Sequence, residues 1–465
     1  MRIGTNVAAI VANNALQKSQ NNLSTSIERL SSGYKINGSK DDAAGCAISE
    51  KMRAQIRGLS QAQNNTADGV SVLNTAEGAI TEIQSMLTRL KELSVQAAND
   101  VNSDDEREAI QKEIEQINNE IDRISDQTEF NTQSLINGNL SRRVYSDLQG
   151  VNQLSVSDSY TAGVYGITVT EDARQAIAVG AGSITMSSTA SITKEQEGTI
   201  NINGYKISIS EGDTLDKVMG KIIDGVNITG GSAFTVKDLN NDTAANGTDY
   251  AGYVPTADYA GSTLVIMTNQ YGSDQKMNIT CDNAELADIL GIPQAATQDG
   301  IYVEGSDVKA EIATGDDGKR IGFADSAILS TKGTVITVTD VNNKEFSMDV
   351  PGNAAGTVFD DSNNDGQSAA GAGTARTISQ EVTDVGTMSI HVGANQDQVI
   401  VIDIPAITTY SLGTEHMNVM TQYTASRAIS TVDEAINKTN KIRSRIGAYE
   451  NRFDHTTNNL EVSSE

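Results

Sequence analysis

The sequence predicts a multidomain α+β protein. Both chain ends are expected to form a long antiparallel α-helical bundle or coiled coil, with β-rich domains inserted in the middle. All four prolines lie in the middle of the chain, and residues 141–410 hold 30 of the 40 glycines. Apolar residues repeat every three to four positions in the ends and every second position in the middle. Because proline and glycine interrupt helices, the ends favour long helices and the middle favours sheets.

The helical ends carry three apolar seams whose members step alternately by three and four positions. A repeat of 3.5 residues is typical of coiled coils and long bundles, whereas an ordinary amphipathic helix on a globular core needs only one such stripe. We therefore expect the three seams to pack together. Their members are Leu73, Ala76, Ile80, Ile83, Leu87 and Leu90; Ile110, Ile114, Ile117, Ile121 and Ile124; and Val432, Ala435, Thr439, Ile442, Ile446, Tyr449 and Phe453.

Capping residues predict where the helices begin and end. Gly33 suits the position just after a first helix, and Asp41-Asp42 suits the start of a second. Ser103 followed by Glu106 is a capping box that opens a third helix. The second helix then runs from about residue 43 to residue 98, a length of about 80 Å at 1.5 Å per residue. A rod of that length suits a protein that packs beside copies of itself.

Turn signals in the middle predict small β modules. Asn203-Gly204 lies between the alternating segments 200–202 and 205–209, which is a strong hairpin signal, and a short helix is expected after residue 214. A second hairpin is expected in which Ile336 and Val338 face Phe346, Met348 and Val350 across residues 340–344.

Composition excludes several classes of protein. The 34 basic and 61 acidic residues give a formal charge of −27, which argues against binding to nucleic acid or to an anionic membrane surface. The two cysteines (Cys46, Cys281) and three histidines (His391, His416, His455) are too few and too scattered for a disulfide framework or a zinc site. The sequence contains no run of about 18 apolar residues, so we expect no transmembrane helix. Its N-terminus also lacks the apolar core of a signal peptide.

Motifs for catalysis and cofactor binding are also missing. No phosphate-binding loop, dinucleotide fingerprint, nucleophile elbow or H-E-x-x-H pair occurs, so we expect no enzyme activity, no cofactor and no metal. Asp361, Asn363, Asp365 and Gly366 match the first half of a calcium loop, but Ala372 stands where the bidentate glutamate belongs. A polar loop is the better interpretation of that segment.

Several motifs in the two ends resemble bacterial flagellins. They cover about residues 1–140 and 420–465 and are far more specific than a shared coiled-coil pattern. The ββα stretch at 200–222 is similar to an insert motif of flagellins and hook-associated proteins. The motifs are IERLSSGYKIN (27–37), DDAAGCAI (41–48), QAQNN (61–65), LNTAEGA (73–79), RLKELSVQAAN (89–99), FN (130–131), LING (135–138), IGA (446–448) and NRFD (451–454).

This resemblance implies an extracellular subunit that polymerises into the bacterial flagellar filament after export through the flagellar type III apparatus. Its partners would be copies of itself, a flagellar export chaperone, and the cap and hook-associated proteins. The implied organisation is an N-terminal filament-core helix (1–40), the N-side of a helical rod (41–140), variable β-rich outer domains (141–410) and the C-side of the rod (411–465). We expect two outer domains, one of them spanning about 190–300.

The resemblance also implies a contact surface for the innate flagellin-sensing Toll-like receptor. The corresponding positions are Arg89, Glu92, Leu93, Gln96 and Glu113. Many flagellins carry arginine where this chain has Lys91, and the two cations bind partners differently. The same helix face is expected to pack subunit against subunit, and we weight assembly above receptor binding for these residues.

One departure from the family pattern concerns the C-terminus. Flagellins continue past the helix that holds Phe453 into another amphipathic helix, which pairs with the N-terminal one. The sequence stops at Glu465, so we expect the terminal core helix to be missing and the chain to be a fragment. Three alternatives to a filament subunit remain open at this point: a hook–filament junction protein, a surface adhesin acting through the central domain, and an enzyme housed in the insert.

Overall fold

The protein is described by a computed structural model. It carries seven helices among the described residues, in the order α1 (Val7–Ser32), α2 (Ala43–Ala97), α3 (Asp104–Gln127), α4 (Leu215–Ile228), α5 (Ala284–Ile289), α6 (Thr409–Leu412) and α7 (Gln422–Ser464). The described residues are 7–157, 160–180, 182–237, 259, 261–292, 300–315, 318–340, 344–352, 359–360, 369–370, 375–383 and 385–465. The suspected calcium loop, with Asp361, Asn363, Asp365 and Gly366, lies outside them, as does Ala372.

The expected helix boundaries are confirmed. The helix α1 ends at Ser32 and is followed by Gly33 with φ +75°. The Asp42 carboxylate accepts a hydrogen bond from the Gly45 amide (3.0 Å) at the start of α2, which runs over 55 residues. The capping box of α3 has both of its bonds, because Ser103 accepts from the Glu106 amide and Glu106 accepts from the Ser103 amide.

The chain divides into two compact units, and each is described by itself. The first unit comprises Met1–Ser71, Ser389–Ile400 and Glu450–Glu465. In it, the Asn65 side chain donates a hydrogen bond to the carbonyl of His391 (3.0 Å). Gly69 lies close to the Phe453 ring there, since an added Cβ would lie 3.0 Å from it, which is tighter than an ordinary contact. The part of α2 around Asn65 and Gly69 therefore packs against the segment around β20 (Met388–His391) and the end of α7.

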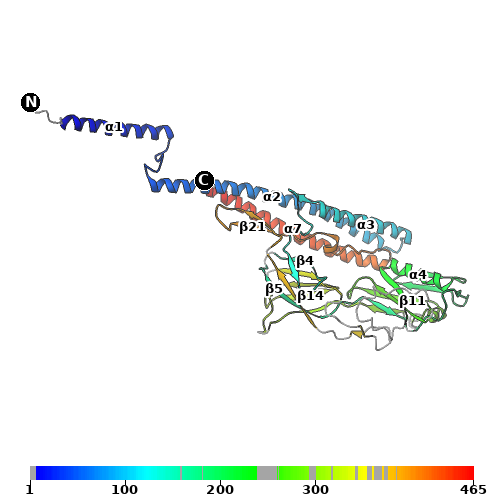
Figure 1. The fold of residues 1–465 in the computed structure, drawn as a ribbon. Coiled ribbons are helices and arrows are strands. Elements are labelled where there is room, and N and C mark those ends of the chain that lie inside the picture. The colour runs from blue at the N-terminus through cyan, green and yellow to red at the C-terminus, as the bar shows by residue number, and fades with distance from the viewer. Residues whose placement is uncertain are drawn as a thin grey trace, which may run out of the picture. The chain divides into compact units, whose positions relative to one another are not determined.

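The second unit comprises Val72–Met388 and Val401–Tyr449. Its helical part, called the rod here, consists of α2 from Val72 onward, α3, and α7 up to Tyr449. These three helices lie side by side (Figure 1), and successive residues of α2 meet residues of α7 in the reverse order, so the two run antiparallel.

The rest of the second unit is built mainly from four antiparallel sheets. Their strand orders are β6-β10-β9, β12-β11-β7-β8, β13-β5-β19-β3 and β14-β15-β16-β4. The strands are β3 (Val144–Ser146), β4 (Asn152–Val156), β5 (Gly163–Glu171), β6 (Ile177–Val179), β7 (Gly198–Ile202), β8 (Tyr205–Ile209), β9 (Gly231–Lys237), β10 (Ser262–Thr268), β11 (Lys276–Cys281), β12 (Ile301–Glu304), β13 (Lys309–Ile312), β14 (Ile328–Lys332), β15 (Val335–Thr339), β16 (Glu345–Asp349) and β19 (Arg376–Val382).

Short two-stranded pairs complete the strands of the described residues. They are β1 (Glu129–Phe130) with β2 (Gln133–Ser134), β17 (Phe359–Asp360) with β18 (Ala369–Ala370), and β20 with β21 (Val399–Ile402).

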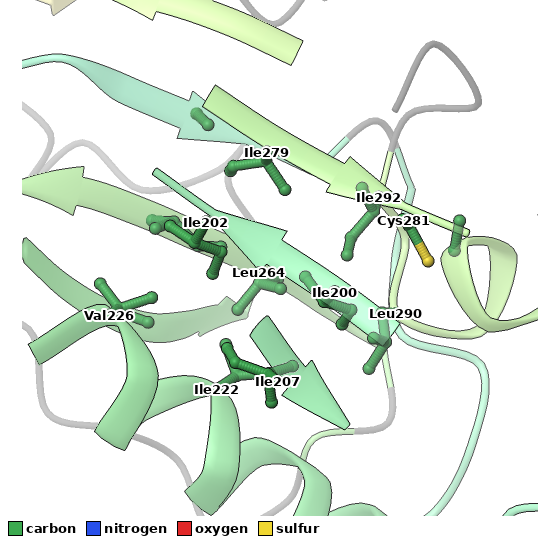
Figure 2. Close-up of a cluster of buried hydrophobic side chains, with 14 of the residues drawn as sticks. Ile200, Ile202, Ile207, Ile222, Val226, Leu264, Ile279, Cys281, Leu290 and Ile292 are labelled. Atoms are coloured by element: carbon green, nitrogen blue, oxygen red, sulfur yellow. The ribbon is translucent and has the colours of Figure 1, made fainter. Parts of the chain in front are cut away.

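The side chains of these sheets pack into two main hydrophobic cores. One lies between α4 and the strands β7, β8, β10 and β11 and is built largely from isoleucine, with Ile200, Ile222 and Ile279 among its members (Figure 2). The other centres on the aromatic rings of Tyr160, Tyr165, Phe323 and Phe346, which meet mostly edge to face with centroids 5.1–6.1 Å apart. Such edge-to-face contacts are a favoured geometry for aromatic pairs.

Both hairpins expected from the sequence are confirmed. In the first, Asn203 (φ +50°) and Gly204 (φ +92°) turn the chain between β7 and β8, and positive φ at both positions is the geometry of a type I′ turn. In the second, Ile336 pairs with Met348 and Val338 with Phe346 across β15 and β16. The short helix after residue 214 is α4, capped by Thr214.

Candidate assembly and receptor surface of the helical rod

The seam residues form the apolar interior between the packed helices. Fifteen of the eighteen residues proposed for the seams are buried, and nine of these have large side chains that are at most 1 % exposed: Leu73, Ile80, Ile83, Leu87, Leu90, Ile114, Ile121, Ile446 and Phe453. The other three, Ile117, Ile124 and Ile442, are half-buried, and Ile442 lines a hollow of about 70 Å³ between α7 and β4. Burial of each large aliphatic side chain contributes about 1.5–3 kcal/mol to stability. The seam therefore supplies most of the cohesion of the rod.

Polar pairs along the edge of the seam match α2 to α7. Lys91 Nζ lies 2.6 Å from Asp433 Oδ1, and Gln84 Nε2 donates to Asn440 Oδ1 (3.1 Å). Further along the two helices, the Arg443 guanidinium of α7 donates twice to Glu77 Oε1 of α2 (2.9 and 2.7 Å). Partly exposed pairs of this kind contribute at most about 1 kcal/mol each. Their main effect is on register, because sliding one helix past the other would break all of them together.

Arg89 joins α2 to α3 on the surface of the rod. Its Nε and Nη2 both donate to Glu113 Oε1 (3.0 and 2.7 Å), and its Nη1 donates to Glu92 Oε2 (3.2 Å). The Glu113 carboxylate raises the pKa of Arg89, with a further contribution from Glu92. All three side chains are about half exposed. The structure thus brings together three of the five residues proposed for the receptor surface, in a fixed arrangement of charges.

The other two proposed residues lie differently. Gln96 is exposed on α2, two turns beyond Arg89, whereas Leu93 is 1 % exposed and belongs to the interior of the rod. A signal for the position of Leu93 is present in the sequence, because it continues the seam from Leu90 with a step of three. The five residues therefore do not form one exposed surface in the single chain.

Arg107 is a residue of the rod that the seam pattern did not single out. Its Nε donates to the carbonyl of Ala97 (3.1 Å) and its Nη2 to the carbonyl of Asn99 (3.1 Å), at the end of α2. The residue is 9 % exposed, and its guanidinium caps the carbonyl of the buried Ala97 and shares the carbonyl of Asn99 with the Asn102 amide. Its position three residues before Ile110 places it on the seam face of α3.

Within the described ranges, no group of three or more His, Cys, Asp or Glu side chains is arranged to hold a metal ion. None of the described helices is long and apolar enough to cross a membrane. Cys281 is buried and its pKa is raised by that burial, which disfavours a reactive thiolate.

The two helical ends of the chain match known family models. Residues 3–141 match the bacterial flagellin N-terminal helical region, and residues 429–465 match the bacterial flagellin C-terminal helical region. The second match runs to the last residue of the sequence, so it gives no support to the expectation that the terminal core helix is missing.

The similar proteins are flagellins, and they match either most of this chain or a part of it. The flagellin of Salmonella typhimurium is 30 % identical over 98 % of this chain and 88 % of its own length. The flagellin of Clostridium tyrobutyricum is 39 % identical over 45 % of this chain and 63 % of its own length. Among solved structures, FliC from Burkholderia pseudomallei matches with 14 % identity, covering 83 % of this chain and 99 % of its own, but its TM-score of 0.24 adds nothing to the assignment.

A rod of long antiparallel helices with a continuous apolar seam, carrying β-sheet domains between its two chain ends, defines a structural protein. The family matches and the full-length similarity to the Salmonella flagellin identify it further. The chain belongs to the bacterial flagellin family. It is a non-enzymatic filament subunit of the extracellular bacterial flagellum, and it assembles with copies of itself.

Proposed function

We propose that α1 supplies the main apolar contact between neighbouring subunits of the filament. The helix has no buried residue. Its large apolar side chains are 48–86 % exposed: Val7, Ile10, Val11, Leu16, Leu23, Ile27 and Leu30. Leaving such a stripe in water forgoes about 25 cal/mol for every Å² that could be buried, so the stripe favours association with a similar helix of another copy.

Seeded polymerisation of the purified chain tests this proposal. Leu23→Asp is expected to lower the amount of sedimentable polymer at least tenfold, because the charge falls in the middle of the stripe. Asn21→Asp is the matched control, since it adds the same charge two residues away, about 200° around the helix. Both variants should keep the free energy of unfolding within about 0.5 kcal/mol of the parent, as expected for exposed positions. Normal polymer yield from Leu23→Asp would refute the role of α1.

The same stripe would be covered by other flagellar proteins before and after assembly. We propose that an export chaperone shields apolar helices of the chain during export, and that the cap and hook-associated proteins contact the filament-core helix at the two ends of the filament. The support is the exposed stripe of α1 together with the family. Co-purification with each partner should weaken for Leu23→Asp and persist for Asn21→Asp.

We also propose that the Arg89, Glu92 and Glu113 cluster is recognised by the innate flagellin-sensing Toll-like receptor, with Gln96 at its edge. The cluster is exposed in the single chain, and its hydrogen bonds hold the guanidinium in place before any partner arrives. Preorganised groups lose less entropy on binding.

A reporter-cell assay with monomeric protein tests the receptor proposal. Arg89→Ala is expected to reduce activation at least tenfold. Lys112→Ala removes a neighbouring surface cation that pairs only within α3, with Glu108 (2.6 Å), and should leave activation unchanged. Equal activation by Arg89→Ala and the parent would refute the proposal.

For the domain organisation, we propose a filament-core helix (1–40), a rod (41–140 with 411–465) and outer domains (141–410) that contain two cores. All members of the two main hydrophobic cores fall between residues 144 and 382. Limited proteolysis followed by mass spectrometry should release stable fragments from 141–410. Cleavage that cuts both cores at the same rate as the flanking segments would count against this division.

A further inference from the structure

A cleft lies in the second unit where the ends of the rod helices meet the sheet of β7, β8, β11 and β12. It consists of two adjoining hollows of about 480 and 330 Å³, which share Asn203, Lys276 and Tyr423 as lining residues. Both volumes fall within the range of small-molecule sites, which form preferentially between domains. Neither the seam nor the surface around Arg89 uses these residues.

Three tyrosines line the larger hollow. Tyr205 and Tyr423 are half-buried, and Tyr302 is 52 % exposed. They come from β8, α7 and β12, so the fold gathers rings that are far apart in the sequence. Both hydroxyl groups can donate hydrogen bonds, and burial raises the pKa of Tyr205 and Tyr423, so the hydroxyls stay neutral further into the alkaline range. Tyrosine rings of this kind offer an apolar face together with a polar rim.

A cation sits over one face of two of the three rings. Lys276 Nζ lies 5.6 Å from the centroid of the Tyr302 ring, and the Tyr302 hydroxyl donates to Glu304 Oε1 (2.6 Å). The Arg427 guanidinium lies 6.0 Å from the centroid of the Tyr423 ring and donates to Gln275 (3.1 Å). The Tyr302 and Tyr423 rings are therefore oriented by the protein before any ligand arrives.

The larger hollow is lined by charges of both signs, Asp100 and Asp104 against Arg107, Lys206 and Lys276, and most of them are paired. Arg107 lies 3.9 Å from both Asp100 and Asp104, and Lys276 Nζ lies 2.7 Å from Glu304. A cationic ligand would meet Lys276 and Arg107, and an anionic ligand would meet the two aspartates. An aromatic cage for a quaternary ammonium needs the opposite, an absence of competing cations. The larger hollow therefore presents a like charge to a strongly charged ligand of either sign.

We propose that this cleft binds a short neutral oligosaccharide, so that the filament subunit is also a carbohydrate-binding protein. A pyranose ring presents a face of C–H groups that packs on the electron-rich face of an aromatic ring, and a rim of hydroxyl groups that both donate and accept hydrogen bonds. Oriented tyrosine rings beside paired charges and the exposed Asn278 match those two properties. In a filament the cleft is repeated once per subunit, so weak single-site binding would be reinforced by multivalency.

Binding of the purified full chain to an array of neutral and sialylated oligosaccharides is the first test. We expect binding to neutral oligosaccharides that persists at high salt, because no net charge attracts the ligand. Binding confined to sialylated or sulfated glycans, or no binding to any neutral glycan, would overturn the proposal.

Variants then locate the site. Tyr302→Ala should weaken the affinity for the best neutral glycan at least tenfold in calorimetry, whereas Tyr302→Phe keeps the ring and should retain most of it. Tyr145→Ala is the matched control, because Tyr145 is also an exposed strand tyrosine (55 %) but lies on β3, outside the cleft. Unchanged affinity in Tyr302→Ala, or equal loss in Tyr145→Ala, would place the glycan elsewhere and overturn the proposal. Thermal unfolding of each variant checks that the fold is kept.

Discussion

The helix α1 and the second half of α2 have similar apolar patterns and opposite surroundings. Along α2 from Val72 to Ala97, the seam side chains are completely buried, whereas α1 has no buried residue at all. The spacing of Leu16, Leu23, Ile27 and Leu30 is the same kind of three-and-four stepping as that of the seam. An apolar period thus predicts which face of a helix will be covered. It does not say whether the cover comes from the same chain.

The sharpest way to break this comparison is a charge in the seam. Leu87→Asp buries a carboxylate among apolar side chains at a position with no exposure, and we expect a loss of about 4 kcal/mol or more in the free energy of unfolding. Urea unfolding followed by circular dichroism measures it, and the yield of filaments should fall as well. Ser85→Asp, two residues earlier on the exposed side of α2, is the control and should be close to neutral. A stable Leu87→Asp variant would remove residue 87 from the seam.

A smaller effect is expected at the end of α2, where the rod uses a polar group instead of an apolar one. Arg107→Ala leaves the carbonyls of Ala97 and Asn99 without their guanidinium donor, which should cost about 1–3 kcal/mol. Hydrogen exchange should then quicken in the last turn of α2 and much less in its middle. Arg123→Ala is the comparison variant, because Arg123 is an exposed cation of α3 that pairs with Glu120 on the same helix. Equal losses in the two variants would show that Arg107 does not act as a cap.

The smallest effect is the pH dependence of the α3 cap. Hydrogen bonds from the Ser103 backbone and side chain lower the pKa of Glu106. A carboxylate with a lowered pKa in the folded state stabilises the fold above its unfolded pKa of about 4.3, and that contribution is lost as the pH falls through the folded value. The stability difference between the parent and Glu106→Gln should therefore shrink as the pH drops below about 4. A difference that stays constant between pH 7 and pH 3 would contradict this account of the cap.

Much of the rod could be predicted because its signals are local. Gly33, Asp42 and the Ser103–Glu106 box mark helix ends through bonds that span at most four residues. Asn203-Gly204 marks the β7–β8 turn in the same way, since both residues adopt positive φ within the turn itself. The seam follows from periodicity, and even the half-buried Ile442 lies on the face that the spacing assigns to it.

The polar contacts of the rod could not be predicted in the same way. Lys91 meets Asp433, and Arg443 meets Glu77, across more than 340 residues of intervening chain. Leu93 is a different case, because its spacing predicts burial and the resemblance predicts exposure. The resemblance to flagellins places it on a receptor surface, but its step of three from Leu90 turns it into the interior. Motif matching identifies which residues correspond between relatives, whereas exposure depends on which helices come to cover them.

The cleft at the end of the rod lies beyond both kinds of signal. Tyr205, Tyr302 and Tyr423 carry no shared motif and are separated by about 100 residues each. They meet because the β7–β8 turn, β12 and the start of α7 converge at one place in the fold. No local sequence pattern predicts that these three segments come together.

By itself the sequence determined the division into helical ends and a β-rich middle, the helix boundaries and the two hairpins. These depend on backbone preferences and on apolar periods that act within a few residues. Only the tertiary structure decided the register of α2 against α7, the capping role of Arg107 and the gathering of three tyrosines in one cleft. Each of these depends on side chains brought together from distant parts of the chain, where the free energy of a contact is set by packing and not by sequence neighbours.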